Sequence, residues 1–213
     1  TLLPCIIILG VFLALIVFEP DLGTAVSIVI VAFMLLICAG LRIKYLLYGC
    51  LTAIILGFPL IYFYQYRVQR ILTFLNPWDD PQGSGFQIIQ SLIAVGSGGL
   101  TGLGLMEGIQ KRFYLPEPHT DFIFAVIGEE WGLVGTLLVL GLFGIFLLRG
   151  VRLSLKAPDS FGWFLGIGLT MMIVCQAFIN MSVTLSLLPT KGIPLPFISS
   201  GGSSLLVSLL SVG

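Results

Sequence analysis

Apolar runs of about 20 residues recur along this chain of 213 residues, and each is long enough to cross the hydrocarbon core of a membrane. We expect five full spans and a sixth, shorter one, at approximately residues 1–18, 22–40, 45–64, 122–148, 162–186 and 202–213. The predicted fold class is therefore an all-α integral membrane protein, a polytopic helical bundle that forms a single membrane domain over residues 1–213.

The composition agrees with this prediction, because 57% of the residues are hydrophobic, 9% are charged and the mean hydropathy is +1.10. The formal net charge is zero, so no excess of positive charge indicates nucleic acid as a partner. The four cysteines lack CxxC spacing, which gives no sign of a metal site or a disulfide framework. The chain starts without methionine and stops inside an apolar run, so we expect both ends to lie within a longer protein.

The basic residues between the spans predict the topology. Two connections are short and basic, and they contain Arg42 and Lys44 in the first and Arg149, Arg152 and Lys156 in the second. The positive-inside rule places both connections in the cytoplasm. Alternation then places residues 18–23, 65–121 and 188–202 on the outer side of the membrane.

The segment 65–121 is too long and too polar to be a simple turn, and we expect it to be a large extracytoplasmic loop. Its glycine-rich stretches at 83–86 and 96–108 permit tight turns and close approach of the main chain to a ligand. Neither stretch has the residue order of a phosphate loop or the context of a dinucleotide fingerprint, so nucleotide binding is not indicated. Residues 86–95 are predicted to form a short helix at the outer membrane surface that roofs a cavity.

Four cations of this loop run against the positive-inside bias: Arg67, Arg70, Lys111 and Arg112. An anionic ligand would explain them, since each guanidinium group can bind two phosphate oxygens at once. Four such cations could hold a pyrophosphate. The alternative, equally open for each of them, is pairing with the carboxylates of the loop or with lipid headgroups.

Ionisable residues near membrane depth are costly and often mark function, but several of them here have simpler explanations. Asp21 is expected to cap the helix that begins at the sequence LGTA. Glu129 and Glu130 lie about two turns inside a span, so we expect at least one to face the bundle interior and find a donor. Structural pairing is the preferred interpretation for these two glutamates.

The sequence YLPEPHTDFIFAVIGEE at 114–130 places His119 and Asp121 where an apolar run begins. By spacing alone, Thr120 or Asp121 could be only the N-cap of the following helix. His119 is the only histidine of the chain, and a lone histidine makes a poor metal site, so we expect it to orient a neighbour rather than to bind metal.

Four stretches resemble the SEDS proteins (shape, elongation, division and sporulation), whose members include FtsW, RodA and SpoVE: EPDLGTA, NPWDDPQGSGFQIIQSLIAVGSGGLTGLGL, QKRFYLPEPHTDFIFAVIGEE and LPTKGIPLPFISSGGSSL. The resemblance implies a bundle of about ten transmembrane helices, of which the six predicted here would be the last six. Lys191 in the last stretch favours the FtsW division branch over the elongation branch typified by RodA. Ser200 departs from the family, which usually has tyrosine at this position.

The resemblance implies a peptidoglycan glycosyltransferase that polymerises lipid II, a disaccharide-pentapeptide on undecaprenyl pyrophosphate, at the outer face of the bacterial cytoplasmic membrane. Joining two sugars needs a base for the acceptor hydroxyl, cations for the departing pyrophosphate and a groove open to the bilayer. By resemblance, the essential carboxylate of the family falls on Asp121, and Arg70 matches a basic family position. The other candidate substrate-binding residues are Lys111, Arg67, Arg112, Glu117, His119 and Lys191.

No metal ligand is predicted, although a divalent cation is a conceivable cofactor of such a reaction. The implied partners are lipid II, a class B penicillin-binding protein that supplies transpeptidation, other division proteins and membrane lipid. The main alternative is a flippase for the same lipid-linked precursor, and an elongation-type polymerase is another. A flippase needs a polar path through the bilayer midplane, whereas many of the charges here gather in one outer loop, which favours the enzyme. A scaffold role for division proteins is compatible with either activity.

Overall fold

The structure is a computed structural model that describes residues 2–19, 21–113 and 115–213, with side chains described at these positions except 2, 3, 22, 54, 56, 60, 112 and 113. The described residues form helices and loops without a β-strand. In chain order the elements are α1 (Leu2–Phe18), α2 (Leu22–Cys38), α3 (Ile43–Tyr62), α4 (Gln65–Leu75), the 3-10 helix η1 (Pro77–Asp79), α5 (Phe86–Ser97), α6 (Gln110–Phe113), α7 (Ile123–Ser154), α8 (Ser160–Thr184) and α9 (Gly202–Val212).

The six predicted spans correspond to α1, α2, α3, α7, α8 and α9, which confirms the all-α fold class. Helices α7 and α8 are each long and apolar enough to cross a membrane. The apolar parts of the other four are shorter, at 10–17 residues. The predicted outer loop contains α4, η1, α5 and α6, so it is largely helical itself.

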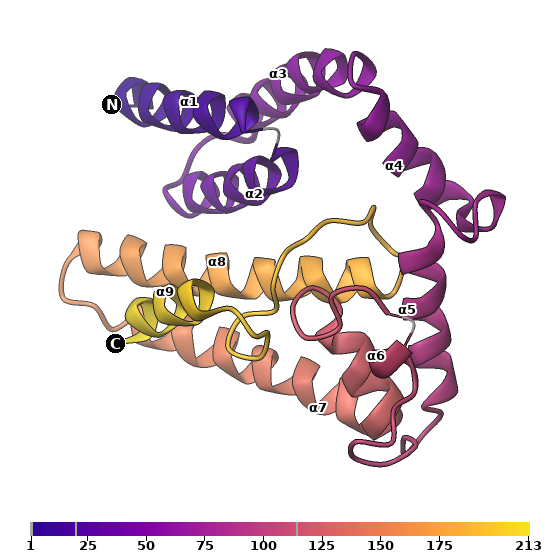
Figure 1. Cartoon of the computed structure of the whole chain (residues 1–213). Helices are drawn as coiled ribbons and strands as arrows, with labels where there is room; N and C mark the ends of the chain where they lie inside the picture. The colour runs from indigo at the N-terminus through magenta and orange to yellow at the C-terminus, as the bar shows by residue number, and fades with distance from the viewer. Residues whose placement is uncertain (1, 20, 114) are drawn as a thin grey trace.

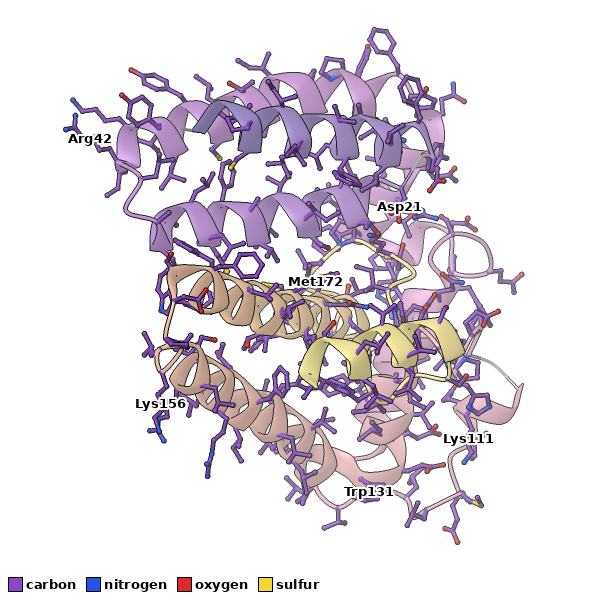
Figure 2. All side chains as sticks on the ribbon, turned by 90° about the vertical axis from the view of Figure 1, so that its left-hand side faces the viewer. Asp21, Arg42, Lys111, Trp131, Lys156 and Met172 are labelled. Carbon is purple, nitrogen blue, oxygen red and sulfur yellow. The ribbon has the colours of Figure 1, made fainter. Side chains whose placement is uncertain are left out.

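Helix α8 lies between α2 and α7 and contacts both, while α1 packs on α2 and α9 packs on α8 (Figure 1). Helix α5 runs across the ends of α7 and α8 and packs on both of them (Figure 1). Figure 2 places Arg42 and Lys156 at one end of the bundle and Asp21 and Lys111 at the other. This arrangement separates the two groups of connections as the predicted alternation requires.

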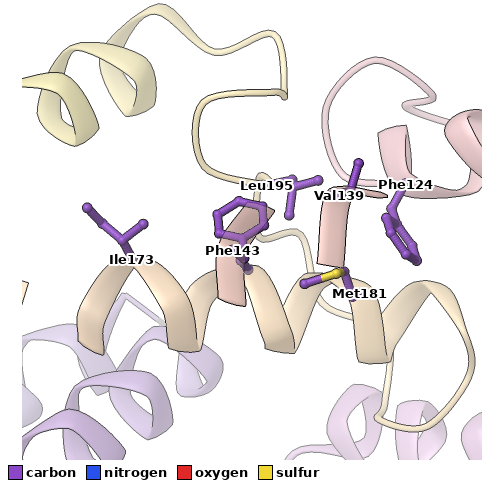
Figure 3. Packing of buried hydrophobic residues seen from close by; sticks show 7 residues of the cluster. Phe124, Val139, Phe143, Ile173, Met181 and Leu195 are labelled. Atoms are coloured by element: carbon purple, nitrogen blue, oxygen red, sulfur yellow. The ribbon is translucent and has the colours of Figure 1, made fainter. Parts of the chain in front are cut away.

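The main hydrophobic core lies between α7, α8 and the connection that follows α8 (Figure 3). Its buried members are Phe124, Val139, Phe143, Ile173, Ala177, Met181 and Leu195. A second cluster joins Ala94 of α5 to Phe122 and Ala125 at the start of α7. Both clusters fix the first turn of α7, where the outer loop meets the bundle. Large apolar side chains on the outward faces stay exposed, such as Phe12 at 58% and Leu210 at 72%, as expected for surfaces that meet lipid or further helices.

Helix α7 is interrupted at Gly132, whose φ of 63° and ψ of −154° are not helical. The glycine-rich segment that follows α5 fills this break. The Leu103 N–H donates to the Glu129 carbonyl at 3.0 Å, and the Leu133 N–H donates to the Gly99 carbonyl at 2.9 Å. These bonds satisfy backbone groups that the break removes from the helical ladder. The glycine-rich segment is thereby hydrogen-bonded to α7 on both sides of the break, and it holds the first part of this helix in place.

Candidate active site

A cavity of about 410 Å³ opens where the outer loop meets the ends of the long helices. Its walls come from four places in the sequence: α4, the turn before α5 with the start of that helix, the segment before α7 and the connection after α8. The residues that line it are Arg70, Gln82, Gly83, Ser84, Phe86, Gln87, Pro116, Asp121, Phe122, Thr190, Lys191 and Gly192. The cavity therefore collects one carboxylate and two cations from the predicted site, since Asp121, Arg70 and Lys191 all reach it.

Asp121 lies just before Phe122, which is the N-cap residue of α7 and has no side-chain capping bond. The interpretation of Asp121 or Thr120 as the N-cap of this helix is therefore wrong. Among the residues that the structure describes, none donates a hydrogen bond to the Asp121 carboxylate. Its backbone is held firmly instead, because the buried amide of Asn180 donates to the Asp121 carbonyl and to the Ile193 carbonyl, both at 2.7 Å. The carboxylate is thus positioned by its main chain, and it lines the cavity without a hydrogen bond from a described residue.

The surroundings of Asp121 alter its acidity. Partial burial raises the pKa of its carboxyl, and the nearby charge of Glu117 raises it further. Glu117 is brought close by a turn in which its carbonyl accepts bonds from the N–H groups of Thr120 and Phe122. A raised pKa moves a carboxylate toward the range in which a general base works well near neutral pH.

Lys191 is the second predicted residue at the cavity, and its ammonium is bound by two residues that do not line the cavity. It donates to the Thr24 hydroxyl at 3.0 Å and pairs with Asp21 at 3.1 Å. Burial lowers the pKa of Lys191, and the Asp21 carboxylate only partly opposes this effect. Burial also raises the pKa of Asp21, but the bonds from Thr24 and Lys191 outweigh it and hold this pKa below its ordinary value. Asp21 is in addition the N-cap of α2, as predicted, since it accepts from the Thr24 N–H at 3.1 Å.

Four predicted residues with described side chains do not line this cavity: Glu117, discussed above, and Arg67, Lys111 and His119. Arg67 is buried, donates to the Tyr66 hydroxyl at 2.6 Å and lies 4.5 Å from the centre of the Tyr64 ring. Lys111 forms an ion pair with Glu130. His119 is exposed and is not among the residues that line the cavity, although its carbonyl accepts a bond from the N–H of Ser200 at 2.8 Å. The side chain of Arg112 lies outside the described part of the chain.

The two glutamates of α7 are both paired, as their depth in the helix predicted. Glu130 binds Lys111, and one oxygen of Glu129 accepts from the N–H groups of Ile109 and Gln110 at 2.8 and 3.1 Å. These bonds anchor the segment before α6 to the break in α7. Lys111 therefore has a structural partner in this state, and a contact between Lys111 and a ligand stays a prediction.

The structure also assigns roles that the sequence did not suggest for three residues. Gly192 lies against the Asp121 carboxylate, Thr24 binds Lys191, and Asn180 joins two chain segments. Only Asn180 has a local signal, because it is an amide within an apolar run. Within the described residues, no group of three or more His, Cys, Asp or Glu side chains could hold a metal ion.

A second cavity, of about 380 Å³, lies between α2 and α8 and shares Gly192 with the first. Its lining is mostly apolar and includes Ile28, Val31, Leu35 and Met172. Thr24, at one end of α2, lines it next to Gly192. The polar cavity therefore adjoins, at Gly192, an apolar one that lies along α2 and α8.

The sequence matches the family of cell cycle proteins that comprises FtsW, RodA and SpoVE over residues 1–213. It is 49% identical to the probable peptidoglycan glycosyltransferase FtsW of Geobacter metallireducens over 99% of this chain and 56% of that protein. It is 48% identical to the stage V sporulation protein E of Bacillus subtilis over 97% of this chain and 56% of that protein. The chain thus spans little more than half the length of these relatives.

Two solved structures share the fold. One is a chain of a peptidoglycan synthase complex that coordinates polymerization and crosslinking, with a TM-score of 0.75 and 32% identity over 94% of this chain and 56% of that one. The other is a mutant of the rod shape determining protein RodA from Thermus thermophilus, with a TM-score of 0.60 and 29% identity over 94% of this chain and 50% of that one. From its match over the whole chain and from these relatives, the protein belongs to the FtsW, RodA and SpoVE family of cell cycle proteins.

Proposed function

We propose that this chain carries the active site of a peptidoglycan glycosyltransferase that polymerises lipid II at the outer face of the bacterial cytoplasmic membrane during division. The observation that carries the proposal is the cavity that Asp121 lines together with Arg70 and Lys191, where no described donor binds the Asp121 carboxylate. The names of the relatives support the same reaction class, because several of them are probable peptidoglycan glycosyltransferases.

The cavity offers what the reaction needs. Asp121 takes the proton of the acceptor sugar hydroxyl, whose oxygen then attacks the anomeric carbon of the donor sugar. The bond from that carbon to the pyrophosphate oxygen breaks, and the undecaprenyl pyrophosphate leaves with the bonding electrons. Arg70 and Lys191 stabilise the negative charge that develops on this leaving group. A divalent cation bound to the pyrophosphate would add to their charge, and its presence is part of the proposal to be tested.

The apolar cavity between α2 and α8 suits the polyprenyl chain of the substrate. It adjoins the polar cavity at Gly192, so a pyrophosphate near Lys191 could extend its hydrocarbon tail along these helices. Burial of each methylene of such a tail contributes about 0.8 kcal/mol. The remaining predicted contacts, Arg67, Lys111, Arg112, Glu117 and His119, would act around this centre, with Glu117 acting through the pKa of Asp121.

A class B penicillin-binding protein is the proposed partner, because glycan strands must be crosslinked where they are made. The similar fold found in a complex for polymerization and crosslinking supports this pairing. The basic connections that hold Arg42 and Lys156 would face the cytoplasm, which would place the cavity on the same outer side as the transpeptidase.

The test compares the complete protein with its Asp121→Asn variant, each purified with the transpeptidase partner and supplied with labelled lipid II. Asparagine keeps the size of the side chain but cannot act as a base, so glycan synthesis should fall about 100-fold or more while lipid II binding persists. Because Asp121 is not a cap, thermal stability should not fall. Addition of EDTA and then of Mg²⁺ tests the divalent cation. Near-parental polymerisation by the variant would remove Asp121 from the mechanism, and lipid II transfer across vesicles without any polymer would favour the flippase.

A further inference from the structure

The ammonium of Lys191 is the one cation of the polar cavity whose described partners come from a distant membrane helix. The Thr24 hydroxyl and the Asp21 carboxylate hold it at 3.0 and 3.1 Å, although both precede it by about 170 residues. The Lys191 side chain is only 15% exposed, whereas that of Asp21 is 44% exposed. The pair therefore joins a cavity residue to an anchor at the protein surface.

The stem of Lys191 is held as closely as its head. It passes directly over Gly23, where an added Cβ would lie 1.9 Å from the Lys191 Cδ and 2.5 Å from its Nζ. The absence of a side chain at Gly23 thus creates the channel that the lysine follows. Three residues within four positions of one another, Asp21, Gly23 and Thr24, fix one rotamer of a side chain that would otherwise be flexible.

We infer that Asp21, Gly23 and Thr24 are positioning residues for the glycosyl-transfer site, which hold Lys191 so that its ammonium meets the pyrophosphate of the substrate. This inference rests on the proposed function and deepens it, because it assigns part of the site to Asp21, in the connection between α1 and α2, and to the first turn of α2. None of these three residues lines the polar cavity, and they act on it only through the lysine that they hold.

Two physical effects give these three residues their role. A lysine that is already ordered loses less conformational freedom when it binds the substrate, so binding is tighter. The Asp21 carboxylate also favours the charged form of a partly buried amine, which burial would otherwise neutralise more readily. Both effects act on substrate binding, and neither acts on the proton transfer at Asp121.

The first test is Asp21→Asn in the complete protein with its transpeptidase partner, assayed with labelled lipid II. Asparagine caps helices about as well as aspartate, so α2 and the thermal stability should be preserved. The KM for lipid II should rise about tenfold while kcat stays within about twofold. Glu19→Gln is the matched control, since it removes an exposed negative charge from the same connection and should leave both constants unchanged.

The second test is Gly23→Ala, which removes no charge. Alanine is the better helix former, so α2 should not be weakened, but its methyl group must displace Lys191. The KM should again rise about tenfold, and this variant decides the question if Asp21→Asn does not fold. Gly10→Ala is its control, because nothing described lies within 4 Å of a Cβ there.

A double variant shows whether the effect passes through the lysine. In a Lys191→Met background, Asp21→Asn should cause no further rise in KM. An unchanged or lowered KM in both single variants, or a full additional rise in the double variant, would overturn the inference. If Asp121→Asn abolishes polymerisation in the same assay, such a result rejects the inference alone. If Asp121→Asn polymerises like its parent, the proposed function fails and the inference fails with it.

Discussion

Gly192 lies so close to Asp121 that a Cβ at this glycine would stand 2.8 Å from the Oδ2 atom of the carboxylate. Residues 71 positions apart in the sequence are thus packed without room for a methyl group. The contact brings the connection after α8 against the turn before α7, and both segments line the polar cavity. Its position makes Gly192 a sensitive probe of the proposed base.

We predict that Gly192→Ala lowers polymerisation by about 10-fold or more, because the methyl group forces the carboxylate from its position. Protein stability should change by less than about 1 kcal/mol, since the backbone conformation does not require glycine there. The measurement is glycan synthesis beside thermal unfolding. Gly202→Ala, at the first residue of α9, is the control, as a Cβ there meets nothing described within 4 Å. Equal activity of the two variants would contradict a role for this packing.

The raised pKa of Asp121 predicts where activity is lost in acid. A base must be deprotonated, so kcat should fall as the pH drops through this pKa, at a higher pH than an ordinary aspartate would give. Glu117→Gln removes one cause of the shift and should move the acid limb of the pH profile to lower pH. The measurement is kcat against pH for parent and variant. An acid limb that stays in place would show that Glu117 does not act on the base.

The same shift has a consequence for stability. Because the folded pKa of Asp121 is raised, its contribution to stability is fully present below the unfolded pKa and is lost as the pH rises through the folded pKa. At neutral pH the charged carboxylate therefore slightly disfavours the fold. Asp121→Asn should unfold at the same or a higher temperature than its parent at pH 7, and a clearly lower temperature would indicate a structural role.

The ion pair between Lys111 and Glu130 provides a test of the predicted contact between Lys111 and pyrophosphate. Both side chains are largely buried, at 17% and 9% exposure, so Lys111→Met should cost about 3 kcal/mol by leaving a carboxylate unpaired. Lys111→Met with Glu130→Gln should recover much of this stability. If Lys111 is structural, the double variant also recovers polymerisation. If it contacts substrate, the double variant folds but stays impaired, and the KM for lipid II distinguishes the two results.

Topology can be tested with single cysteines introduced into a variant in which the four native cysteines, Cys5, Cys38, Cys50 and Cys175, are replaced. Gln82 and Lys156 are exposed and lie in the predicted outer loop and the predicted cytoplasmic connection. An impermeant thiol reagent should label the first from outside intact cells and the second only after the membrane is opened. Labelling of both from the same side would contradict the predicted orientation. Ser154, the last residue of α7, is buried and therefore unsuitable for labelling.

The sequence by itself determined the features that depend on local patterns. Apolar run length predicted every long helix, because burial of a side chain in lipid depends on its own hydropathy. The cap at Asp21 and the pairing of Glu129 and Glu130 were also predictable, since a cap is a matter of spacing and a carboxylate at depth needs a donor. Asp121 was reached by resemblance, and its alternative role as a cap was not excluded until the structure placed Phe122 at that position.

Only the tertiary structure decided which charges meet. Arg70, Lys111 and Lys191 were all candidate contacts for one anion, yet Arg70 and Lys191 line the cavity while Lys111 turns to Glu130. The reason is that the free energy of an ion pair depends on distance and burial, and these depend on how segments far apart in the chain pack. The glycine-rich loop packs into the break at Gly132, and this places Lys111 beside Glu130 of α7. The connection after α8 places Lys191 beside Asp21. Neither partner could be read from the residues around it.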